Sequence, residues 1–500
     1  MPLETSGTLS IGGTTTNRSI NLELGRSATA TSSLGETDLR DLAGVASGAI
    51  GIDDFYGASS GYDVENSIKV QANSGNEWFY RNSPTTGNKR TFTFSFWIKR
   101  TQLTGFQADP YLMSQGTNAR FHFAGDTLRF MFDGNSTELE AAGKLTDCTA
   151  WYHIVLAVDT TQATNTNRVK MYVNGEDYPF NNNDWPSQNQ ESSWMSGTSM
   201  YFNTRDGDGS YDNSGYWAEV AVIDGSALTP TSFGEYDDSG TWKPKDLSGL
   251  SFGNQGFYLK FDNSASLGAD SSGNGKNVTL NNITSADQAT DTPTNNFCTL
   301  NPLWTGNTAY VGLIQEGATI LRYSSGTQPF AKATMGVTNG KWYWEAMPHG
   351  TIGSQYLGIA TGYSFTSGTA LSQNYNMAIN TTGRYYSYSG SLSESAAGQF
   401  TTLTTSNVIG VALNLEDEEI KYYKDGSLIL TRPLIANMQG ETIFPYILNY
   451  ENRSFNLNFG GYTINTISSA ASDANGYGTF EYAPPSGYYA LCTKNLAEYG

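Results

Sequence analysis

Alternation of apolar and polar residues is the dominant pattern along this chain. In the stretch TFTFSFWIKR (91–100), Phe92, Phe94, Phe96 and Ile98 fall on one face, while the serine and two of the threonines fall on the other. A period of two residues is the signature of a β-strand. Similar runs recur at short intervals, separated by turn residues and without helical periodicity, which predicts sandwiches of two β-sheets.

One hairpin unit occurs twice, some 250 residues apart. The stretch SNVIGVALNLEDEEIKYYKDGSLILT (406–431) predicts a strand, an acidic turn, a second strand and a third strand after Asp425-Gly426. Earlier, WYHIVLAVD continues through a polar turn into VKMYVNG, which ends on Asn174-Gly175. Asp-Gly and Asn-Gly readily adopt the positive φ angles of two-residue hairpin loops. We therefore predict two domains that carry the same kind of hairpin.

These patterns predict an all-β chain with two β-sandwich (jelly-roll) domains in tandem, over 59–250 and 303–500. Residues 251–302 are expected to be a connector, because they hold only short apolar runs at 257–261 and 278–280. The rest of this segment is too polar to bury much surface.

Residues 1–58 are predicted to be a separate small module. Short strands are expected at 9–11 and 19–24, and one or two helical turns at 38–43 with Thr37 as N-cap. So few large apolar side chains make a weak isolated core. We therefore expect this module to complete its folding against a partner or in an oligomer.

Composition narrows the functional classes. Only 15% of residues are charged, the net charge is −19, and there are 31 Tyr, 24 Phe and 10 Trp. The negative charge argues against nucleic acid and anionic membranes, which bind through Lys and Arg. Cys148, Cys298 and Cys492 have no disulfide or zinc spacing. We find no secretory signal and no apolar run long enough to span a membrane, so we expect synthesis in a cytoplasm.

Catalytic and metal patterns are weak. Glu416 and Glu418 have the i, i+2 spacing that could pair two carboxylates, yet they lie in an acidic turn that predicts solvated charges. The histidines lie mostly inside strands, and no nucleophile motif is present, so we predict no enzyme activity and no cofactor. Asp206, Asp208 and Asp212 lie on a glycine-rich loop that could suit calcium, but the full calcium-loop pattern is absent.

Exposed aromatic rings beside amides or carboxylates are the candidate ligand-binding groups. Trp185 with Asn183 and Asp184 forms one such set in the first sandwich. In the second sandwich the candidates are Tyr363, Tyr386 and Tyr388, which lie in stretches rich in Gly and Ser. The alternative is that these rings pack in a core or in an oligomer interface.

Several motifs resemble known families. ETDLRDLAG followed by SGAIGIDDFYGAS resembles an N-terminal module of tailed-phage structural proteins, and DSSGNG with DTPTNNF resembles connectors of marine phage fibre-like proteins. The ordered set FTFSFWIK, WYHIVLAVD, VKMYVNG and YWAEVAVIDGSAL is similar to concanavalin A-like domains of the laminin-G type. GKWYWE, LGIA, VIGVALN, IKYYKDG, FPYI and FNLNFG resemble a SPRY-type sandwich.

The resemblance implies a virion protein of a tailed, cyanophage-like phage, most simply a tail fibre or appendage. Residues 1–58 would attach it to other virion proteins, and the sandwiches would contact a host-surface glycan or receptor. Such appendages are commonly homotrimers, and laminin-G-type domains often bind calcium. Two alternatives remain: a capsid-decorating or head-fibre protein, and a polysaccharide depolymerase.

Overall fold

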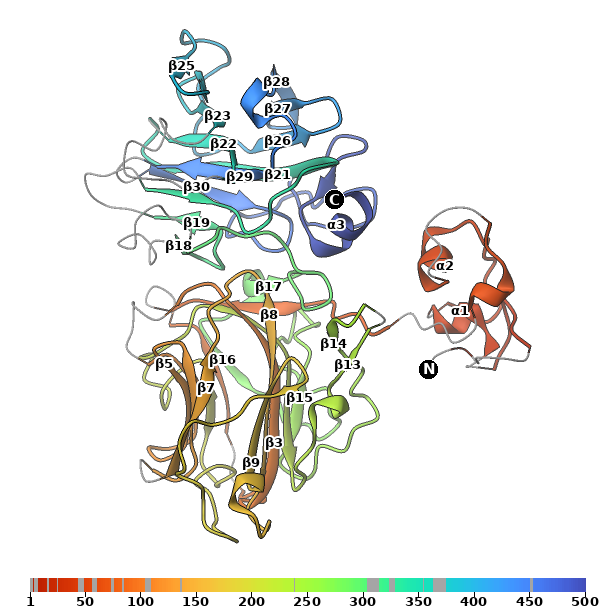
Figure 1. Cartoon of the computed structure of the whole chain (residues 1–500), viewed down its shortest axis with the longest axis vertical. Helices are drawn as coiled ribbons and strands as arrows, with labels where there is room; N and C mark the ends of the chain where they lie inside the picture. The colour runs from red at the N-terminus through yellow and green to blue at the C-terminus, as the bar shows by residue number, and fades with distance from the viewer. Residues whose placement is uncertain are drawn as a thin grey trace. The chain divides into compact units, whose positions relative to one another are not determined.

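The computed structural model describes the chain except residues 1–2, 4–7, 16–17, 25, 44–48, 56–60, 73–75, 83–84, 104–108, 135–136, 238, 304–313, 323–328, 354, 363–374 and 450–452. Its contacts divide it into two compact units, residues 1–63 and 64–500. The regular structure of the described residues is mostly β-strand, as the alternating patterns predict (Figure 1).

The small unit contains short helices rather than strands. α1 (Ile20–Glu23) replaces the predicted strand at 19–24, and only an isolated bridge from Ser10 to Ser19 stands where a strand was predicted at 9–11. α2 (Thr37–Leu42) confirms the predicted helical turns, with Thr37 as its first residue rather than its N-cap, and a 3₁₀ turn follows at Ile52–Phe55. The prediction at 19–24 is wrong because the Ser19 hydroxyl accepts a hydrogen bond from the Leu22 amide and caps a helix instead. Ile20 then packs into a small core with other apolar side chains: Leu3, Leu9, Leu39, Leu42 and Phe55.

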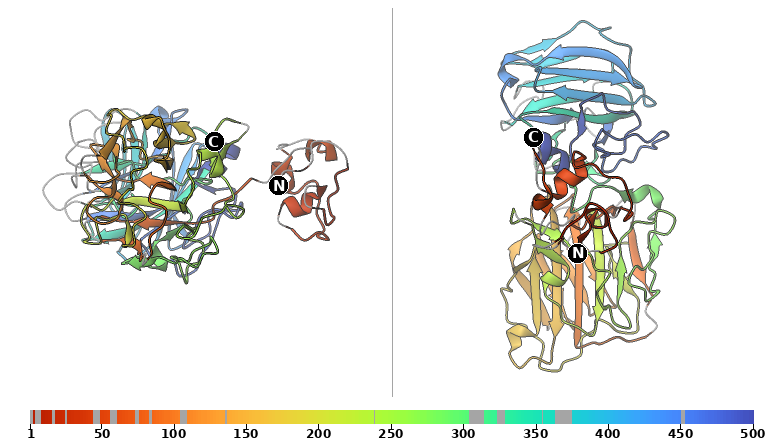
Figure 2. Two further views of the ribbon diagram at one scale, coloured as in Figure 1. Left: turned by 90° about the horizontal axis from the view of Figure 1, so that it is seen from below. Right: turned by 90° about the vertical axis from the view of Figure 1, so that its right-hand side faces the viewer.

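The first sandwich packs two antiparallel sheets face to face (Figures 1 and 2). The order of strands in one sheet is β10 (Glu176–Asp177), β9 (Val169–Val173), β8 (Trp151–Asp159), β3 (Thr91–Arg100), β12 (Gly215–Asp224), β1 (Ser67–Val70), β17 (Gln288–Ala289), with β15 (Phe257–Leu259) also on β12. The order in the other is β16 (Thr279–Asn281), β2 (Trp78–Arg81), β11 (Met200–Phe202), β4 (Tyr111–Ser114), β5 (Arg120–Ala124), β6 (Thr127–Met131), β7 (Glu138–Lys144). A separate hairpin joins β13 (Gly234–Tyr236) to β14 (Trp242–Pro244).

The second sandwich has the same general construction. One sheet runs β18 (Ile314–Gln315), β19 (Ile320–Leu321), β30 (Arg453–Asn458), β21 (Lys341–Gly350), β26 (Ile409–Asn414), β27 (Glu419–Lys424), β28 (Ser427–Pro433), with β31 (Tyr489–Ala490) parallel to β21. The other runs β20 (Phe330–Lys332), β29 (Ile443–Leu448), β22 (Tyr356–Thr361), β23 (Asn376–Asn380), β24 (Tyr385–Tyr388), β25 (Leu392–Glu394). A C-terminal helix, α3 (Thr493–Tyr499), packs beside this sandwich.

The predicted hairpin turns have the expected geometry. Asn174 and Gly175 have φ angles of 49° and 85°, and Asp425 and Gly426 have 50° and 77°. Positive φ at both central residues defines the type I′ turn, whose twist matches that of the flanking strands.

Residues 251–302 differ from the expected connector. β15, β16 and β17 add strands to both sheets of the first sandwich. Phe261, Leu267 and Val278 are buried in its core, so this polar segment buries more than its composition indicates. Farther on, Cys298 and Leu300 already belong to the core of the second sandwich.

The two sandwiches share buried polar contacts. The Lys69 ammonium group lies 2.9 Å from carboxylate oxygens of Glu77 and Asp287 in the first sandwich, and 3.3 Å from Glu316 in the second. The Tyr216 hydroxyl donates to the Gly317 carbonyl at 2.7 Å. Residues 64–500 therefore form one packed unit.

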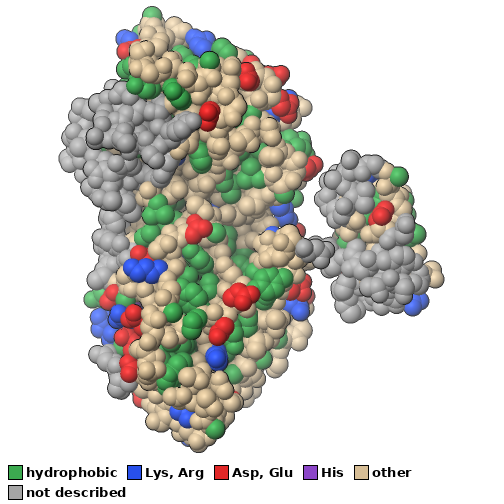
Figure 3. All heavy atoms as spheres, in the orientation of Figure 1, with side chains coloured by type: hydrophobic (Ala, Val, Ile, Leu, Met, Phe, Trp, Pro, Cys, Tyr) green, Lys and Arg blue, Asp and Glu red, His purple; other side chains and the backbone are tan. Residues whose placement is uncertain are grey.

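Figure 3 shows acidic and basic side chains as small scattered groups on the visible face, between non-ionic polar surface and apolar patches. This agrees with a chain that has few charged residues and abundant Gly, Ser, Thr and Asn.

Candidate functional site

The candidate residues of the first sandwich lie on a loop near the edge of its core. Trp185 is half-buried and packs edge-on against Phe180, with ring centroids 5.5 Å apart. Asn183 and Asp184 are exposed, and a carboxylate oxygen of Asp184 accepts a hydrogen bond from the Asn182 amide at 3.0 Å. The indole ring therefore acts mainly as a packing element, with two exposed polar side chains beside it.

Tyr386 and Tyr388 share one face of β24, as their spacing predicts. Tyr385 points to the opposite side and packs against the core. Tyr386 is only 5% exposed and meets the Tyr356 ring edge-on, with centroids 4.9 Å apart. Its hydroxyl donates to a Glu394 carboxylate oxygen at 2.9 Å. This ring is therefore held in place and largely covered, whereas Tyr388 keeps partial exposure.

The same sheet face carries a buried lysine that the sequence did not single out. Lys332 pairs with Tyr446 across β20 and β29, and its ammonium group donates to the Thr361 carbonyl. Burial lowers the pKa of Lys332 to about 7.

Tyr363 lies outside the described residues. The Trp185 group and the Tyr386 group belong to different sandwiches, so the structure does not combine them into one site.

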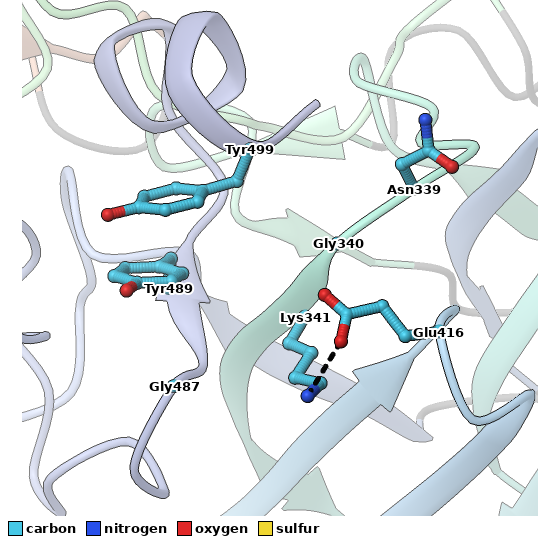
Figure 4. Close-up of a pocket in the computed structure, with 7 residues that line it drawn as sticks. All are labelled: Asn339, Gly340, Lys341, Glu416, Gly487, Tyr489 and Tyr499. Carbon is cyan, nitrogen blue, oxygen red and sulfur yellow. Dashed lines mark ion pairs between the residues drawn. The ribbon is translucent and has the colours of Figure 1, made fainter. Parts of the chain in front are cut away.

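A pocket lies beside the hairpin formed by β26 and β27. It has a volume of about 350 Å³ and is lined by the following residues: Asn339, Gly340, Lys341, Glu416, Gly487, Tyr489 and Tyr499. Figure 4 shows the two tyrosines on one side of Gly340, and the Lys341–Glu416 pair with Asn339 on the other.

Asn414 organises the acidic turn that forms one wall of this pocket. Its side-chain oxygen accepts hydrogen bonds from the Glu416 and Asp417 amides, both at 3.0 Å, and its amide donates to the Asp417 carboxylate at 2.7 Å. Lys341 begins β21 and pairs with Asn414 in the sheet. Its ammonium group therefore reaches Glu416, at 2.8 Å.

The aromatic wall comes from the C-terminal part of the chain. Tyr489 lies in β31 beside Trp342 of β21, and Tyr499 lies in α3. Their rings stack with centroids 3.8 Å apart and planes 9° apart. Gly340, with φ of 81°, passes close to the Tyr499 carbonyl, where a Cβ atom would approach to 2.7 Å. Only glycine therefore fits comfortably at the base of the pocket.

The buried Asp473 fixes this wall. One of its oxygens accepts hydrogen bonds from the Ala490 amide at 2.9 Å and from the Asn495 side chain at 2.8 Å, which ties β31 to α3. Sequence patterns missed the pocket because its lining comes from three segments that lie far apart in the sequence, at 339–341, 416 and 487–499. The adjacent aromatic residues Tyr488 and Tyr489 were the local signal available.

His153, inside β8, occupies a structural position. Its Nδ1 accepts a hydrogen bond from the indole N–H of Trp242 at 2.9 Å. Because an indole N–H can only donate, the proton of the neutral imidazole lies on Nε2. Nε2 therefore donates to the Ser95 hydroxyl at 2.9 Å. Burial lowers the pKa of His153 to about 3, so the ring is neutral at physiological pH.

The three aspartates of the glycine-rich loop differ in their surroundings. Asp208 uses one carboxylate oxygen to accept hydrogen bonds from the Ser210 amide and hydroxyl. Asp212 is buried, and burial raises its pKa to about 7. Among the residues that the structure describes, no group of three or more His, Cys, Asp or Glu side chains is placed to hold a metal.

In the same portion of the chain, no helix has the length and apolar character needed to cross a membrane.

One family model matches part of the first sandwich. Residues 73–232 match the family model of the concanavalin A-like lectin/glucanases superfamily (Laminin_G_3), which confirms the laminin-G-type resemblance. No curated protein matches the chain.

Solved structures with detectable similarity include a SPRY domain of human HERC1 (14% identity, TM-score 0.24, 30% of this chain and 92% of that one). The PSpry domain of TRIM65 has 12% identity and a TM-score of 0.25, with 32% of this chain and 89% of that one covered. A heptameric SAP-like pentraxin from Limulus polyphemus has 17% identity and a TM-score of 0.25, with 34% and 80% covered. The chain is thus an all-β protein whose first sandwich is similar to concanavalin A-like lectins and glucanases.

Proposed function

We propose that this chain is a non-enzymatic carbohydrate-binding protein of a phage virion, most simply a tail fibre or appendage that recognises a host-surface glycan. The observation that carries the binding role is the match of residues 73–232 to the concanavalin A-like lectin/glucanases superfamily. The composition of the chain supports a carbohydrate-binding role. Uncharged polar groups and tyrosines suit a hydroxyl-rich ligand better than charged groups do.

A binding role is favoured over catalysis by the state of the candidate acid–base groups. Glu416 is paired with Lys341, Asp417 is held by Asn414, and His153 is neutral and fully hydrogen-bonded. Glycoside hydrolysis uses two carboxylates on either side of a cleft. The groups named here do not form such a pair.

The virion assignment rests on the phage-like motifs of residues 1–58 and 251–302. In this proposal residues 1–58 attach the protein to other virion proteins, the chain assembles as a homotrimer, and the sandwiches face the host. A capsid-decorating or head-fibre protein is the second candidate, since it would carry the same motifs.

The test is a glycan array together with a whole-cell binding screen, both with the purified full-length chain. We expect retention of a restricted set of glycans and binding to host cells that soluble glycan inhibits. Absence of binding to both would contradict the proposal. Release of reducing ends from purified envelope polysaccharide would show a depolymerase instead.

A further inference from the structure

We propose that the pocket between the Tyr489–Tyr499 stack and the Lys341–Glu416 pair is a binding site for one neutral sugar residue. This inference rests on the proposed carbohydrate-binding function and places a site in the second sandwich, outside the segment that matches the lectin superfamily. The pocket volume of about 350 Å³ is near the lower end of the range for small-molecule sites.

One wall of the pocket is mainly apolar and the other is polar. A sugar ring likewise carries both C–H groups and hydroxyl groups. The stacked tyrosines supply aromatic carbon, against which the C–H groups of a pyranose can pack. Figure 4 shows their hydroxyls pointing away from the ion pair, so this wall is mainly apolar. The opposite wall offers the exposed Asn339 amide, the Lys341 ammonium group and the Glu416 carboxylate, which can donate to and accept from hydroxyls.

The groups are held before any ligand arrives. The Asn414 bonds fix the turn that bears Glu416, and the Asp473 bonds fix the two tyrosine-bearing segments. Preorganised groups lose little freedom on binding, which favours a useful affinity from a small contact area.

Charge selects the class of sugar. Lys341 and Glu416 neutralise each other, and Asp417 lies next in the same turn. The whole chain carries a net charge of −19, which repels anionic ligands at long range. The pocket should therefore take neutral hexoses or N-acetylhexosamines in preference to uronic acids.

The experiment titrates the full-length chain with glucose, galactose, mannose, N-acetylglucosamine and glucuronate, and with any glycan retained on the array. Asn339→Ala removes a side-chain amide from the pocket, and Glu416→Gln replaces its carboxylate by a neutral amide; neither change touches the core. We expect each to weaken binding of a neutral sugar by about five- to ten-fold, as for the loss of one hydrogen bond. Glu418→Gln is the matched control, because it removes a carboxylate from the same turn but not from the pocket, and it should leave affinity unchanged.

The outcomes separate the two proposals. Sugar binding that survives both pocket variants would overturn this site and leave the carbohydrate-binding function standing. Tighter binding of glucuronate than of every neutral sugar would overturn the ligand class. Failure of the wild-type chain to bind any monosaccharide or glycan would overturn the pocket and the proposed function together.

Discussion

His153 shows how a single buried side chain makes stability depend on pH. Its pKa falls to about 3 in the folded protein because burial disfavours the charged ring, whereas an unfolded histidine protonates near pH 6.5. Below pH 6.5 the unfolded chain therefore binds more protons at this position than the folded chain does. Its contribution to stability is complete above pH 6.5 and is lost as the pH falls toward 3.

Replacing this ring should flatten that dependence. His153→Asn keeps an acceptor for the Trp242 indole and removes the titrating group, so it should lower stability at pH 7 through imperfect packing. Between pH 6.5 and 4, however, its free energy of unfolding should fall by about 3 kcal/mol less than that of the wild type. Urea unfolding at several pH values measures this. His349→Asn is the comparison, because this more exposed ring has a pKa lowered by partial burial and should flatten the dependence less. An equal slope for His153→Asn and wild type would contradict the prediction.

At the scale of elements, the sequence predicts strands well where side chains alternate. Residues 91–100 and 151–159 are strands with the predicted bounds, because their aromatic and β-branched side chains suit a pleated sheet. The pattern fails at 20–23, where a serine cap outweighs the alternation. It makes no prediction at 493–499, where a helix too short for a clear period is held by Asp473.

The candidate site was less predictable than the strands, because it depends on contacts between residues far apart in the sequence. Local spacing predicted the shared face of Tyr386 and Tyr388, but not that Tyr356 and Glu394 cover Tyr386. The pocket depends on the parallel pairing of β31 with β21, which no local pattern encodes.

The turn at Asn174-Gly175 offers a test of how one element supports another. A Cβ atom at Gly175 would lie 2.5 Å from the Trp242 ring, which also donates to His153. Gly175→Ala should therefore cost about 2–4 kcal/mol, from positive φ and from displacement of the indole. Gly240→Ala is the matched control, since φ is 78° there and no atom lies within 4 Å of the added Cβ. It should cost about 1 kcal/mol, and equal losses in thermal unfolding would contradict the role of Trp242.

At the scale of the whole molecule, the contacts between the sandwiches decide whether residues 64–500 behave as one unit. Lys69 is 2% exposed and neutralises carboxylates from both sandwiches, and Gln71 accepts a hydrogen bond from the Glu316 amide at 2.8 Å. Groups buried in this way cannot part without exposing or stranding charges. The two sandwiches should therefore move together rather than as separate bodies.

Removal of the shared ammonium group tests this coupling. Lys69→Met would leave Glu77, Asp287 and Glu316 close together without their counter-charge, which should cost about 3–5 kcal/mol. Lys245→Met is the control, because this lysine is partly exposed and lies 3.9 Å from Glu235 at the surface, so its loss should cost under about 1 kcal/mol. Scanning calorimetry of the wild type should show residues 64–500 unfolding in one transition, and Lys69→Met should lower its midpoint or split it. Two separate transitions already present in the wild type would mean that the sandwiches unfold independently and that the buried contacts do not couple them.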